Sequence, residues 1–365
     1  MEILCIGDVM ILGNNIGAAA KELKLNNLNI DIKDWETDWD KLQDRRLIIE
    51  KQGPSAESVV PQILNASKNT EILLVLFCPV SKNAIDALPK LKLIGATRAG
   101  LENIDVKYAT EKGIIVQNLK GRNAQAVSDF TIGLILGEVR NIARSYHAIK
   151  NGIWRKNFVN SDMILELQGK TIGLVGFGYI GQLVAQKLSG FQVNILVFDP
   201  YISDEEIQKY HVKKVTLEEL LKKADFVSLH ARMSKETKHM IGEKELSLMK
   251  NTVYLVNTAR AGLIEEDALF QVLKEKKIAG AALDVFWKEP IGENSRWLEL
   301  DNVTLTTHIA GTTKEALTKS PYLLVEDINK LLEDKEPKFV VNPEVLKRAE
   351  VRKWLEEVRS TPDVS

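Results

Sequence analysis

The sequence predicts an α/β protein made of two doubly wound domains, each built on a parallel sheet. Its 365 residues are more than one domain of ordinary size needs. Short apolar runs rich in β-branched residues alternate with longer helical patterns, which is typical of parallel strands joined by crossover helices. In the middle of the chain a glycine-rich turn follows one such run directly, as it does in nucleotide-binding sheets.

The first third of the chain is predicted to contain buried strands with helices between them. The strands are expected at Glu2–Gly7, Glu71–Phe77, Leu93–Thr97 and Gly113–Gln117. Helices are expected at Pro54–Lys68, Ser81–Leu88 and Ala124–Lys150, the last of which meets a stop signal at Asn151-Gly152.

The middle third is predicted to be a complete doubly wound nucleotide-binding domain. Its strands are expected at Thr171–Val175, Asn194–Phe198, Phe226–Leu229, Thr252–Asn257, Gly280–Asp284 and Val303–Thr306. The helices that link them are expected at Gln182–Leu188, Leu217–Lys223, Lys244–Met249 and Glu266–Glu275. Beyond this domain we expect a helix near Lys314–Glu333 and a polar C-terminal tail.

The composition argues against several classes of function. A net charge of −1 creates no general attraction to nucleic acid or to an anionic membrane, so we expect neither as a partner. Cys5 and Cys78 lie in apolar, strand-like segments and are expected to be buried, reduced thiols. Because no signal peptide and no apolar run of membrane-spanning length is visible, we expect a cytoplasmic protein, and we expect no metal site.

The motif Gly176-Phe-Gly178-Tyr-Ile-Gly181 lies between the first strand and the first helix of the nucleotide-binding domain. In such a motif the first glycine allows a tight turn, the second lets backbone approach a pyrophosphate, and the third lets helix and strand pack closely. Asp199 follows the next strand, where a carboxylate can accept both ribose hydroxyls and repels a 2′-phosphate. A glycine motif alone is often only a turn, but strand, helix and acidic residue in register predict NAD rather than NADP.

Three ionisable residues follow successive strands of this domain, namely Arg260, Glu289 and His308. Because the carboxyl ends of parallel strands meet at one edge of the sheet, we expect the three to converge at the nicotinamide end of the crevice. Each of them alone would be taken for a surface or structural residue. The remaining histidines have such placements, although His230 ends a strand and could line the cofactor cleft; they are His147, His211, His230 and His239.

The chemistry of these three side chains is complementary. Oxidation of a secondary alcohol needs a base for the hydroxyl proton and reduction of the ketone needs an acid, and imidazole can be either near neutral pH. A neighbouring carboxylate orients the imidazole and stabilises its protonated form. A guanidinium can bind a substrate carboxylate and polarise the carbonyl on which negative charge develops. The pattern predicts hydride transfer at C2 of a small 2-hydroxy acid.

At this point the sequence resembles the D-isomer-specific 2-hydroxyacid dehydrogenases, in particular their phosphoglycerate dehydrogenase-like branch, from about residue 70 to Pro343. The resemblance rests on five ordered motifs. They are Arg98-Ala-Gly-Leu-Glu-Asn-Ile-Asp105, the glycine motif with Asp199, Asn257-Thr-Ala-Arg-Ala-Gly-Leu-Ile264, Gly280-Ala-Ala-Leu-Asp-Val-Phe286 with Glu289-Pro290, and Thr307-His-Ile-Ala-Gly311.

The resemblance implies a division into domains that the linear pattern does not reveal. A discontinuous, flavodoxin-like substrate domain would comprise residues 1–118 and 309–343, a Rossmann-like NAD-binding domain residues 119–308, and the polar tail residues 344–365. The active site would lie between the two domains. By the same analogy Arg260 binds and polarises the substrate, and His308 paired with Glu289 is the acid/base. Arg98, Ala99, Gly100 and Leu101 would contact the substrate.

The resemblance also implies the full set of cofactor contacts and an assembly. The cofactor-binding residues would be Gly176, Gly178, Tyr179, Ile180, Gly181, Asp199, Thr258, Ala259, Arg260, Asp284, His308 and Gly311, with Asp284 holding the nicotinamide carboxamide. Similar proteins form homodimers through the cofactor domain, which here would involve Arg140–Phe158 with Trp154. The stretch 153–168 is longer than expected before the glycine-motif strand, and its role stays open.

Several residues depart from the pattern of the family. Thr307 occupies the position before the histidine where relatives usually have Pro, and Glu102 stands where they have a small or aromatic residue. Relatives that use 3-phosphoglycerate hold its phosphate with a basic residue early in the substrate domain, but Ile72–Ser81 contains no Lys or Arg. Arg98 remains a candidate anion contact. We therefore expect an unphosphorylated or sugar-derived hydroxy acid.

Other interpretations stay open at this stage. One is D-3-phosphoglycerate dehydrogenase proper. Another is an NAD(H)-sensing interaction protein on the same fold, like the corepressors that resemble this family, since fold alone does not determine function. A third is another NAD-dependent enzyme such as an amino-acid dehydrogenase, although the lysine that it requires is missing from these strand ends. The intact Arg260, Glu289 and His308 favour the 2-hydroxyacid dehydrogenase.

Overall fold

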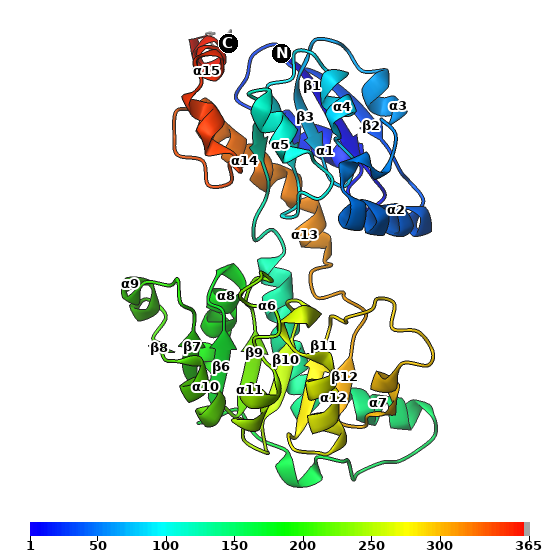
Figure 1. Ribbon diagram of the computed structural model, residues 1–365, viewed down its shortest axis with the longest axis vertical. Helices are drawn as coiled ribbons and strands as arrows, with labels where there is room; N and C mark the ends of the chain where they lie inside the picture. Colours follow the sequence, from blue (N-terminus) through cyan, green and yellow to red (C-terminus); the bar gives the residue numbers. More distant parts are fainter. Residues whose placement is uncertain (361–365) are drawn as a thin grey trace. The chain divides into compact units, whose positions relative to one another are not determined.

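The computed structural model describes residues 1–360, which form two compact units (Figure 1). Unit 1 comprises Met1–Arg122 together with the chain from Thr313 onward, and unit 2 comprises Asn123–Thr312. Each unit is a parallel sheet with helices packed against it, which confirms the predicted fold class. Unit 1 is discontinuous, because a C-terminal segment returns to it.

The sheet of unit 1 has the flavodoxin-like order β2-β1-β3-β4-β5. Its strands are β1 Glu2–Gly7, β2 Asn29–Asp34, β3 Thr70–Val75, β4 Leu93–Ala96 and β5 Ile115–Gln117. The inner strands β3 and β4 are apolar almost throughout, because helices cover both faces of a parallel sheet. The edge strand β2 is partly exposed and carries Asn, Asp and Lys.

Eight α-helices belong to unit 1 within the described residues. They are α1 Gly13–Ala20, α2 Trp39–Gln52, α3 Pro61–Leu64, α4 Lys82–Asp86, α5 Val106–Glu111, α13 Lys314–Thr318, α14 Ser320–Leu332 and α15 Ala349–Ser360, with 3-10 turns η1 Pro54–Ala56 and η6 Pro343–Lys347. The returning helix α14 packs against α1 and places Leu324 and Ile328 in the core.

The structure corrects two expectations in unit 1 and contains three elements that had not been expected. The helix predicted over Pro54–Lys68 is wrong, because Pro54 and Pro61 each begin a new short turn, η1 and α3. The elements α1, β2 and α2 were not predicted. Part of the expected polar tail is helix α15, which buries Val351 and Trp354 in the core of unit 1. Residues 361–365 of that tail lie outside the described part of the chain.

The sheet of unit 2 has the order β12-β11-β10-β9-β6-β7-β8, with all neighbours parallel. Its strands are β6 Thr171–Val175, β7 Asn194–Phe198, β8 Lys213–Lys214, β9 Phe226–Leu229, β10 Tyr254–Asn257, β11 Gly280–Leu283 and β12 Val303–Leu305. The short edge strand β8 was not predicted. Strand order reverses at β6 and β9, and doubly wound sheets bind ligands at the carboxyl ends beside such a reversal.

The helices of unit 2 are α6 Ala124–Val139, α7 Ile142–Lys150, α8 Tyr179–Leu188, α9 Asp204–Gln208, α10 Leu217–Lys223, α11 Glu243–Ser247 and α12 Glu266–Lys274. Its 3-10 turns are η2 Ser161–Met163, η3 Ser189–Phe191, η4 Ala261–Leu263 and η5 Arg296–Glu299. The single helix predicted over Ala124–Lys150 is two helices, because Asn141 between them adopts a left-handed conformation with φ 56°. The helix near Lys314–Glu333 is likewise divided, into α13 and α14.

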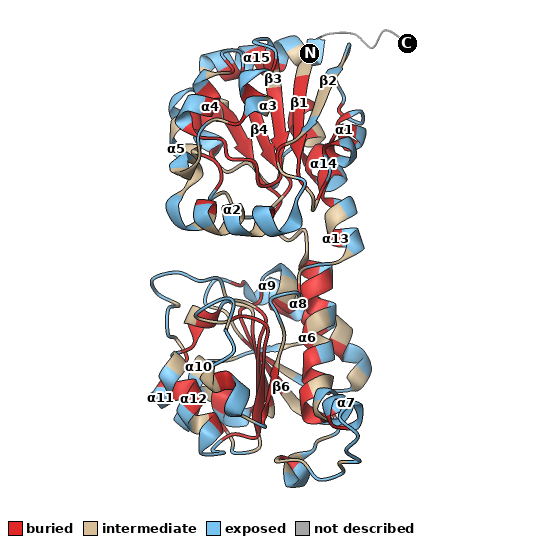
Figure 2. Cartoon of the chain, turned by 90° about the vertical axis from the view of Figure 1, so that its right-hand side faces the viewer, coloured by how far each residue is buried: buried red, intermediate tan, exposed pale blue. Residues whose placement is uncertain are grey.

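Helix α6 lies against β10, β11 and β12 and is largely buried, as the burial colours of Figure 2 show. Its Glu138 is fully buried, yet its carboxylate lies 2.6 Å from Nη2 of Arg144 on α7 and accepts a hydrogen bond from Oγ1 of Thr304. Burial raises the pKa of Glu138, and the ion pair with Arg144 opposes that rise. This buried network ties α7 to the sheet edge at β12.

No helix within residues 1–360 is both long enough and apolar enough to cross a membrane. The same residues contain no group of three or more His, Cys, Asp or Glu side chains arranged to hold a metal ion.

Candidate active site

The glycine motif forms a tight turn between β6 and α8. Gly176 has φ +94°, and a Cβ there would lie 2.5 Å from the backbone nitrogen of Ala231. A Cβ at Gly181 would lie 2.5 Å from the carbonyl oxygen of Gly176. At Gly178, by contrast, no atom lies within 4 Å of the position of a Cβ. Gly176 and Gly181 thus permit close backbone packing. Gly178 leaves open space at the N-terminus of α8, where free N–H groups attract anions.

Asp199 lies at the end of β7, directly beside this turn. Its Oδ2 accepts a hydrogen bond of 2.8 Å from the N–H of Phe177, and its Oδ1 accepts one of 2.8 Å from the N–H of Tyr201. A carboxylate oxygen has two lone pairs, so each oxygen can still accept a ribose hydroxyl. The turn, the N-terminus of α8 and Asp199 therefore fit an adenine dinucleotide, and Tyr179 and Ile180 are the first residues of the helix that opens onto it.

Glu289 and His308 form a hydrogen-bonded pair. Nδ1 of His308 lies 2.8 Å from Oε2 of Glu289, while Oε1 of Glu289 accepts a hydrogen bond of 2.9 Å from the N–H of Phe286. Burial alone would raise the pKa of Glu289, but the bonds from His308 and Phe286 and the charge of Arg260 outweigh it and hold the pKa below its usual value. The carboxylate is therefore ionised. Because Nδ1 faces Glu289, Nε2 is the atom that can reach a substrate.

The loop that carries His308 is fixed by Asp284 at the end of β11. Asp284 is fully buried, and its Oδ1 accepts hydrogen bonds from Oγ1 of Thr306 at 2.6 Å and from the N–H of Ile309 at 3.0 Å. Its Oδ2 accepts a bond of 2.9 Å from the N–H of Ala310. His308 itself has φ 57°, a left-handed conformation that these flanking bonds maintain. The sequence pattern did not reveal this contact.

Arg260 follows β10 in a loop that Asn257 holds. The buried Asn257 donates from Nδ2 to the carbonyl of Arg260 at 3.0 Å and accepts from the N–H of Ala259 at 3.0 Å. Oγ1 of Thr258 lies 2.9 Å from Oγ1 of Thr131 on α6. The Arg260 guanidinium donates from Nη1 to the carbonyl of Ala259 at 2.7 Å. Asn257 and Thr131 are positioning residues whose roles were not predicted. Asn257 appeared only as the first residue of a motif, and nothing distinguishes Thr131 from other polar residues of a helix.

His230 lies at the end of β9, next to the glycine turn. A Cβ on Gly176 would lie 2.7 Å from the carbonyl carbon of His230, so the two backbones touch. Nε2 of His230 lies 3.0 Å from Oγ of Ser228, and its buried Nδ1 has no hydrogen-bond partner among the described residues. Burial lowers the pKa of His230 to about 4, so the imidazole is neutral near pH 7.

The predicted substrate loop lies in unit 1, after β4. The carbonyl of Ala99 accepts a hydrogen bond of 2.6 Å from Nδ2 of Asn118, and the carbonyl of Arg98 accepts one of 2.9 Å from the N–H of Leu119. Ala99 is exposed, and Gly100 and Leu101 are half-buried. Gly311, predicted as a cofactor contact, lies in unit 2, where a Cβ would come within 2.3 Å of Nδ2 of Asn123.

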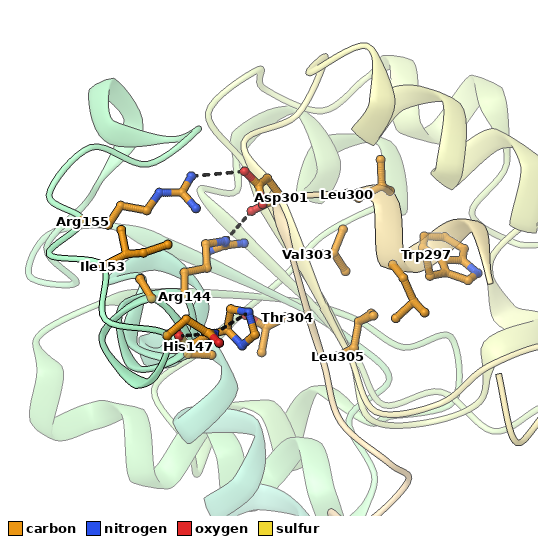
Figure 3. Close-up of a pocket in the computed structure, with 14 residues that line it drawn as sticks. Arg144, His147, Ile153, Arg155, Trp297, Leu300, Asp301, Val303, Thr304 and Leu305 are labelled. Carbon is orange, nitrogen blue, oxygen red and sulfur yellow. Dashed lines mark hydrogen bonds and ion pairs between the residues drawn. The ribbon is translucent and has the colours of Figure 1, made fainter. Parts of the chain in front are cut away.

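A separate hollow of about 560 Å³ lies on unit 2. Figure 3 shows side chains that line it. It is lined by α7, by residues 151–155 and by the segment from Trp297 to Leu305. On its rim Arg155 pairs with the carboxylate of Asp301 at 3.1 Å, and Nε of Arg144 donates to the carbonyl of the same residue. None of Arg260, Glu289 and His308 lines this hollow.

Comparison with known proteins gives consistent results. Residues 132–310 match the family described as D-isomer specific 2-hydroxyacid dehydrogenase, NAD binding domain. The chain is 41% identical over 284 residues to D-3-phosphoglycerate dehydrogenase of Methanocaldococcus jannaschii, an alignment that covers 77% of this chain but only 53% of that relative. It is 40% identical over 297 residues to glyoxylate reductase of Thermofilum pendens, covering 80% of this chain and 86% of the relative.

The solved structures agree with the sequence comparisons. A glyoxylate reductase from Paecilomyes thermophila superimposes with a TM-score of 0.69 at 29% identity, covering 94% of this chain and 99% of that chain. The present chain thus spans about half the length of the relative named D-3-phosphoglycerate dehydrogenase, but 86% of one glyoxylate reductase and 99% of the other.

Proposed function

The chain belongs to the D-isomer-specific 2-hydroxyacid dehydrogenases, NAD-dependent oxidoreductases that act at C2 of a 2-hydroxy acid, and we propose that its own substrate is small and unphosphorylated. The observation that carries the oxidoreductase chemistry is the pair formed by His308 and Glu289 at 2.8 Å, close enough to Arg260 for its charge to act on the carboxylate. The choice of an unphosphorylated acid rests on the segment Ile72–Ser81, which contains no Lys or Arg. An acid/base, a carboxylate that orients it and a guanidinium are the groups that this reaction needs.

His308 acts as the acid/base through Nε2. In the direction of reduction Nε2 donates a proton to the oxygen on C2, and in the direction of oxidation it accepts the hydroxyl proton. Glu289 stabilises the protonated ring through Nδ1 and fixes its orientation. The carboxylate can do this across the neutral pH range because its pKa lies below the usual value.

Arg260 binds the substrate carboxylate and polarises the carbonyl at C2. A guanidinium presents several donors in one plane, so it can contact both groups of a 2-keto acid at once. The bonds from Asn257 to residues 259 and 260 hold its backbone in place. In unit 1, the backbone of Ala99, Gly100 and Leu101 is proposed to bind the same carboxylate.

The residues proposed to hold NAD follow the carboxyl ends of β6, β7, β10, β11 and β12. Gly176, Gly178 and Gly181 with the N-terminus of α8 would accept the pyrophosphate, and Asp199 the adenosine ribose. Tyr179, Ile180, Thr258, Ala259, Arg260, Asp284, His308 and Gly311 complete the proposed set. When bound, the nicotinamide supplies or receives the hydride. Asp284 already accepts three hydrogen bonds from the loop of His308, so we propose that its main role is to hold this loop. Contact with the nicotinamide carboxamide would be its second role.

A screen of NADH oxidation by the full chain tests the proposal. The substrates are glyoxylate, hydroxypyruvate, pyruvate, longer polyhydroxylated 2-keto acids and phosphohydroxypyruvate. We expect turnover with one or more unphosphorylated acids. If NADH binds but no 2-keto acid is turned over, the assignment as an enzyme is overturned in favour of a nucleotide-sensing protein. Preference for phosphohydroxypyruvate would identify a D-3-phosphoglycerate dehydrogenase instead.

The functional assembly is proposed to be a homodimer formed through unit 2. Helix α7 buries Ala148, whereas Ile142, Tyr146 and Ile149 are 58%, 65% and 49% exposed, and Trp154 beyond it is 79% exposed. So much exposed apolar surface on one helix and its extension is typical of a protein interface. The hollow beside α7 (Figure 3) offers space for an aromatic side chain from a second copy, and this would give a role to the stretch 153–168.

Light scattering coupled to gel filtration tests the dimer. The wild-type chain should have twice the mass of one chain, and Trp154→Glu should reduce it to the monomer. Leu64→Glu, at a 51% exposed position on unit 1, is the matched control and should leave the dimer intact. A monomeric wild type would refute the assembly.

The free and buried Cys5 and Cys78 fit the cytoplasm, where we propose that the protein acts.

A further inference from the structure

Four charged residues of unit 1 form one cluster at the carboxyl edge of its sheet. Arg98, at the end of β4, lies 2.9 Å from Glu50 on α2 and 3.3 Å from Glu102 in its own loop. Arg46, one turn before Glu50 on α2, lies 3.9 Å from the same carboxylate. Both guanidinium groups face the ring of Phe77 after β3, at 4.3 Å for Arg98 and 5.5 Å for Arg46. We call Arg46, Glu50, Arg98 and Glu102 the α2 charge cluster.

The cluster lies against the proposed substrate loop. A Cβ on Gly100 would come within 2.4 Å of Oε2 of Glu102 and 2.8 Å of Nη2 of Arg98. The two charged side chains therefore cover the glycine whose backbone is proposed to bind the substrate. A substrate bound by the backbone of Gly100 and Leu101 would contact these two side chains through its substituents beyond C2.

The charges of the cluster are balanced, and its acids are the more accessible part. Arg98 is only 11% and Arg46 is 28% exposed, whereas Glu50 is 31% and Glu102 is 47% exposed. Burial lowers the pKa of Arg98, and the two carboxylates counteract this effect. Arg98 also donates from Nη1 to Oδ1 of Asn103. Its positive charge is thus already paired, and the surface that it leaves to a ligand is mainly carboxylate.

We propose that Glu50 and Glu102 determine substrate specificity by excluding 2-keto acids that carry a second anionic group and accepting those whose remaining substituents are hydroxyls. Within the cluster, a phosphate would meet two carboxylates and two guanidinium groups whose charge these carboxylates already offset, which is an unfavourable arrangement. A hydroxyl can donate a hydrogen bond to either carboxylate at no such cost. The substrate class is therefore hydroxylated, singly charged acids such as hydroxypyruvate or longer polyhydroxy 2-keto acids. This inference rests on the proposed function.

The test compares two acids that differ only in the phosphate. Hydroxypyruvate and phosphohydroxypyruvate are each measured with NADH, for the wild type, Glu102→Gln and the double variant Glu50→Gln with Glu102→Gln. The amides keep the shape but remove the negative charge. We expect the ratio of kcat/KM for the phosphorylated to the unphosphorylated acid to rise about tenfold in the double variant, since Arg98 then becomes an unpaired cation. A rise of less than about threefold would overturn the inference.

Two controls separate charge from structure. Glu102→Asp keeps the charge and should keep the wild-type ratio. Glu57→Gln removes a carboxylate that pairs with Arg45 and is not part of the α2 charge cluster. This variant should also keep the wild-type ratio. Calorimetric binding of both acids to the NADH-bound protein gives a second readout that does not need turnover. If no 2-keto acid binds or reacts, the proposed function fails and the inference falls with it; if hydroxypyruvate reacts but the ratio is unchanged, only the inference fails.

Discussion

Oε2 of Glu289 lies 2.8 Å from Nδ1 of His308, although 19 residues separate the two in the sequence. Glu289 follows β11 and His308 follows β12, and these neighbouring parallel strands bring them together at one edge of the sheet. The pairing orients the imidazole so that Nε2 is the reactive atom.

Replacing Glu289 by Gln should impair the chemistry more than the fold. The amide can still accept from the N–H of Phe286, but it no longer stabilises a positive charge on His308. We expect kcat to fall by about 10- to 100-fold, with NADH affinity little changed. In the wild type, the pKa of Glu289 lies below the ordinary value of a carboxyl group, so Glu289 should cause no loss of activity across the neutral pH range. A variant with wild-type kcat would remove Glu289 from the mechanism.

Replacing Asp199 by Ala should weaken the preference for NADH over NADPH. The wild type should prefer NADH over NADPH by about 100-fold or more in kcat/KM, because the carboxylate beside the glycine turn repels a 2′-phosphate. The variant should narrow that preference at least about tenfold, mainly through a higher KM for NADH. A wild type that prefers NADPH would contradict the role given to Asp199.

Much of unit 2 could be predicted because its strands are buried on both faces and therefore appear as unbroken apolar runs, such as Tyr254–Asn257. The edge strand β2 could not, since it is half-exposed and carries Asn29, Asp31 and Asp34 among its apolar residues. The break between α6 and α7 depends on the left-handed conformation of Asn141, whose neighbours continue the helical pattern on both sides.

The site shows the same division. The motif spacing identified Arg260, Glu289 and His308, and the structure brings Glu289 and His308 into contact. The contacts that hold their loops were not foreseeable, because Asp284 acts on backbone N–H groups 25 and 26 residues away. The α2 charge cluster depends on Glu50, which lies 48 residues before Arg98 on a helix that was not predicted.

Replacing Thr306 by Val should loosen the loop of His308. The substitution keeps the shape of the side chain but leaves Oδ1 of the buried Asp284 without its hydroxyl donor. We expect a loss of about 1–3 kcal/mol in the free energy of unfolding, measured with urea, and a lower kcat. Thr318→Val is the matched control, because its hydroxyl makes an exposed bond to the carbonyl of Lys314. Equal effects of the two substitutions would contradict the role of Asp284.

His230 should make the protein sensitive to acid. Its pKa is lowered to about 4 in the folded state, below the ordinary value of 6.5, so the unfolded chain binds the proton first as the pH falls. The contribution to stability is complete above about pH 6.5 and is lost progressively between about pH 6.5 and pH 4. Between pH 7 and pH 5 the wild type should lose roughly 1–2 kcal/mol more than His230→Gln. The exposed His147→Gln is the control and should behave like the wild type.

The acid/base role of His308 is tested by the turnover of His308→Gln with the best 2-keto acid of the screen, together with its affinity for NADH. We expect kcat to fall by a factor of about 100 or more while the dissociation constant for NADH stays within about threefold of the wild-type value. Turnover at the wild-type rate in this variant would contradict the assignment of His308 as the acid/base, and with it the mechanism proposed for the site.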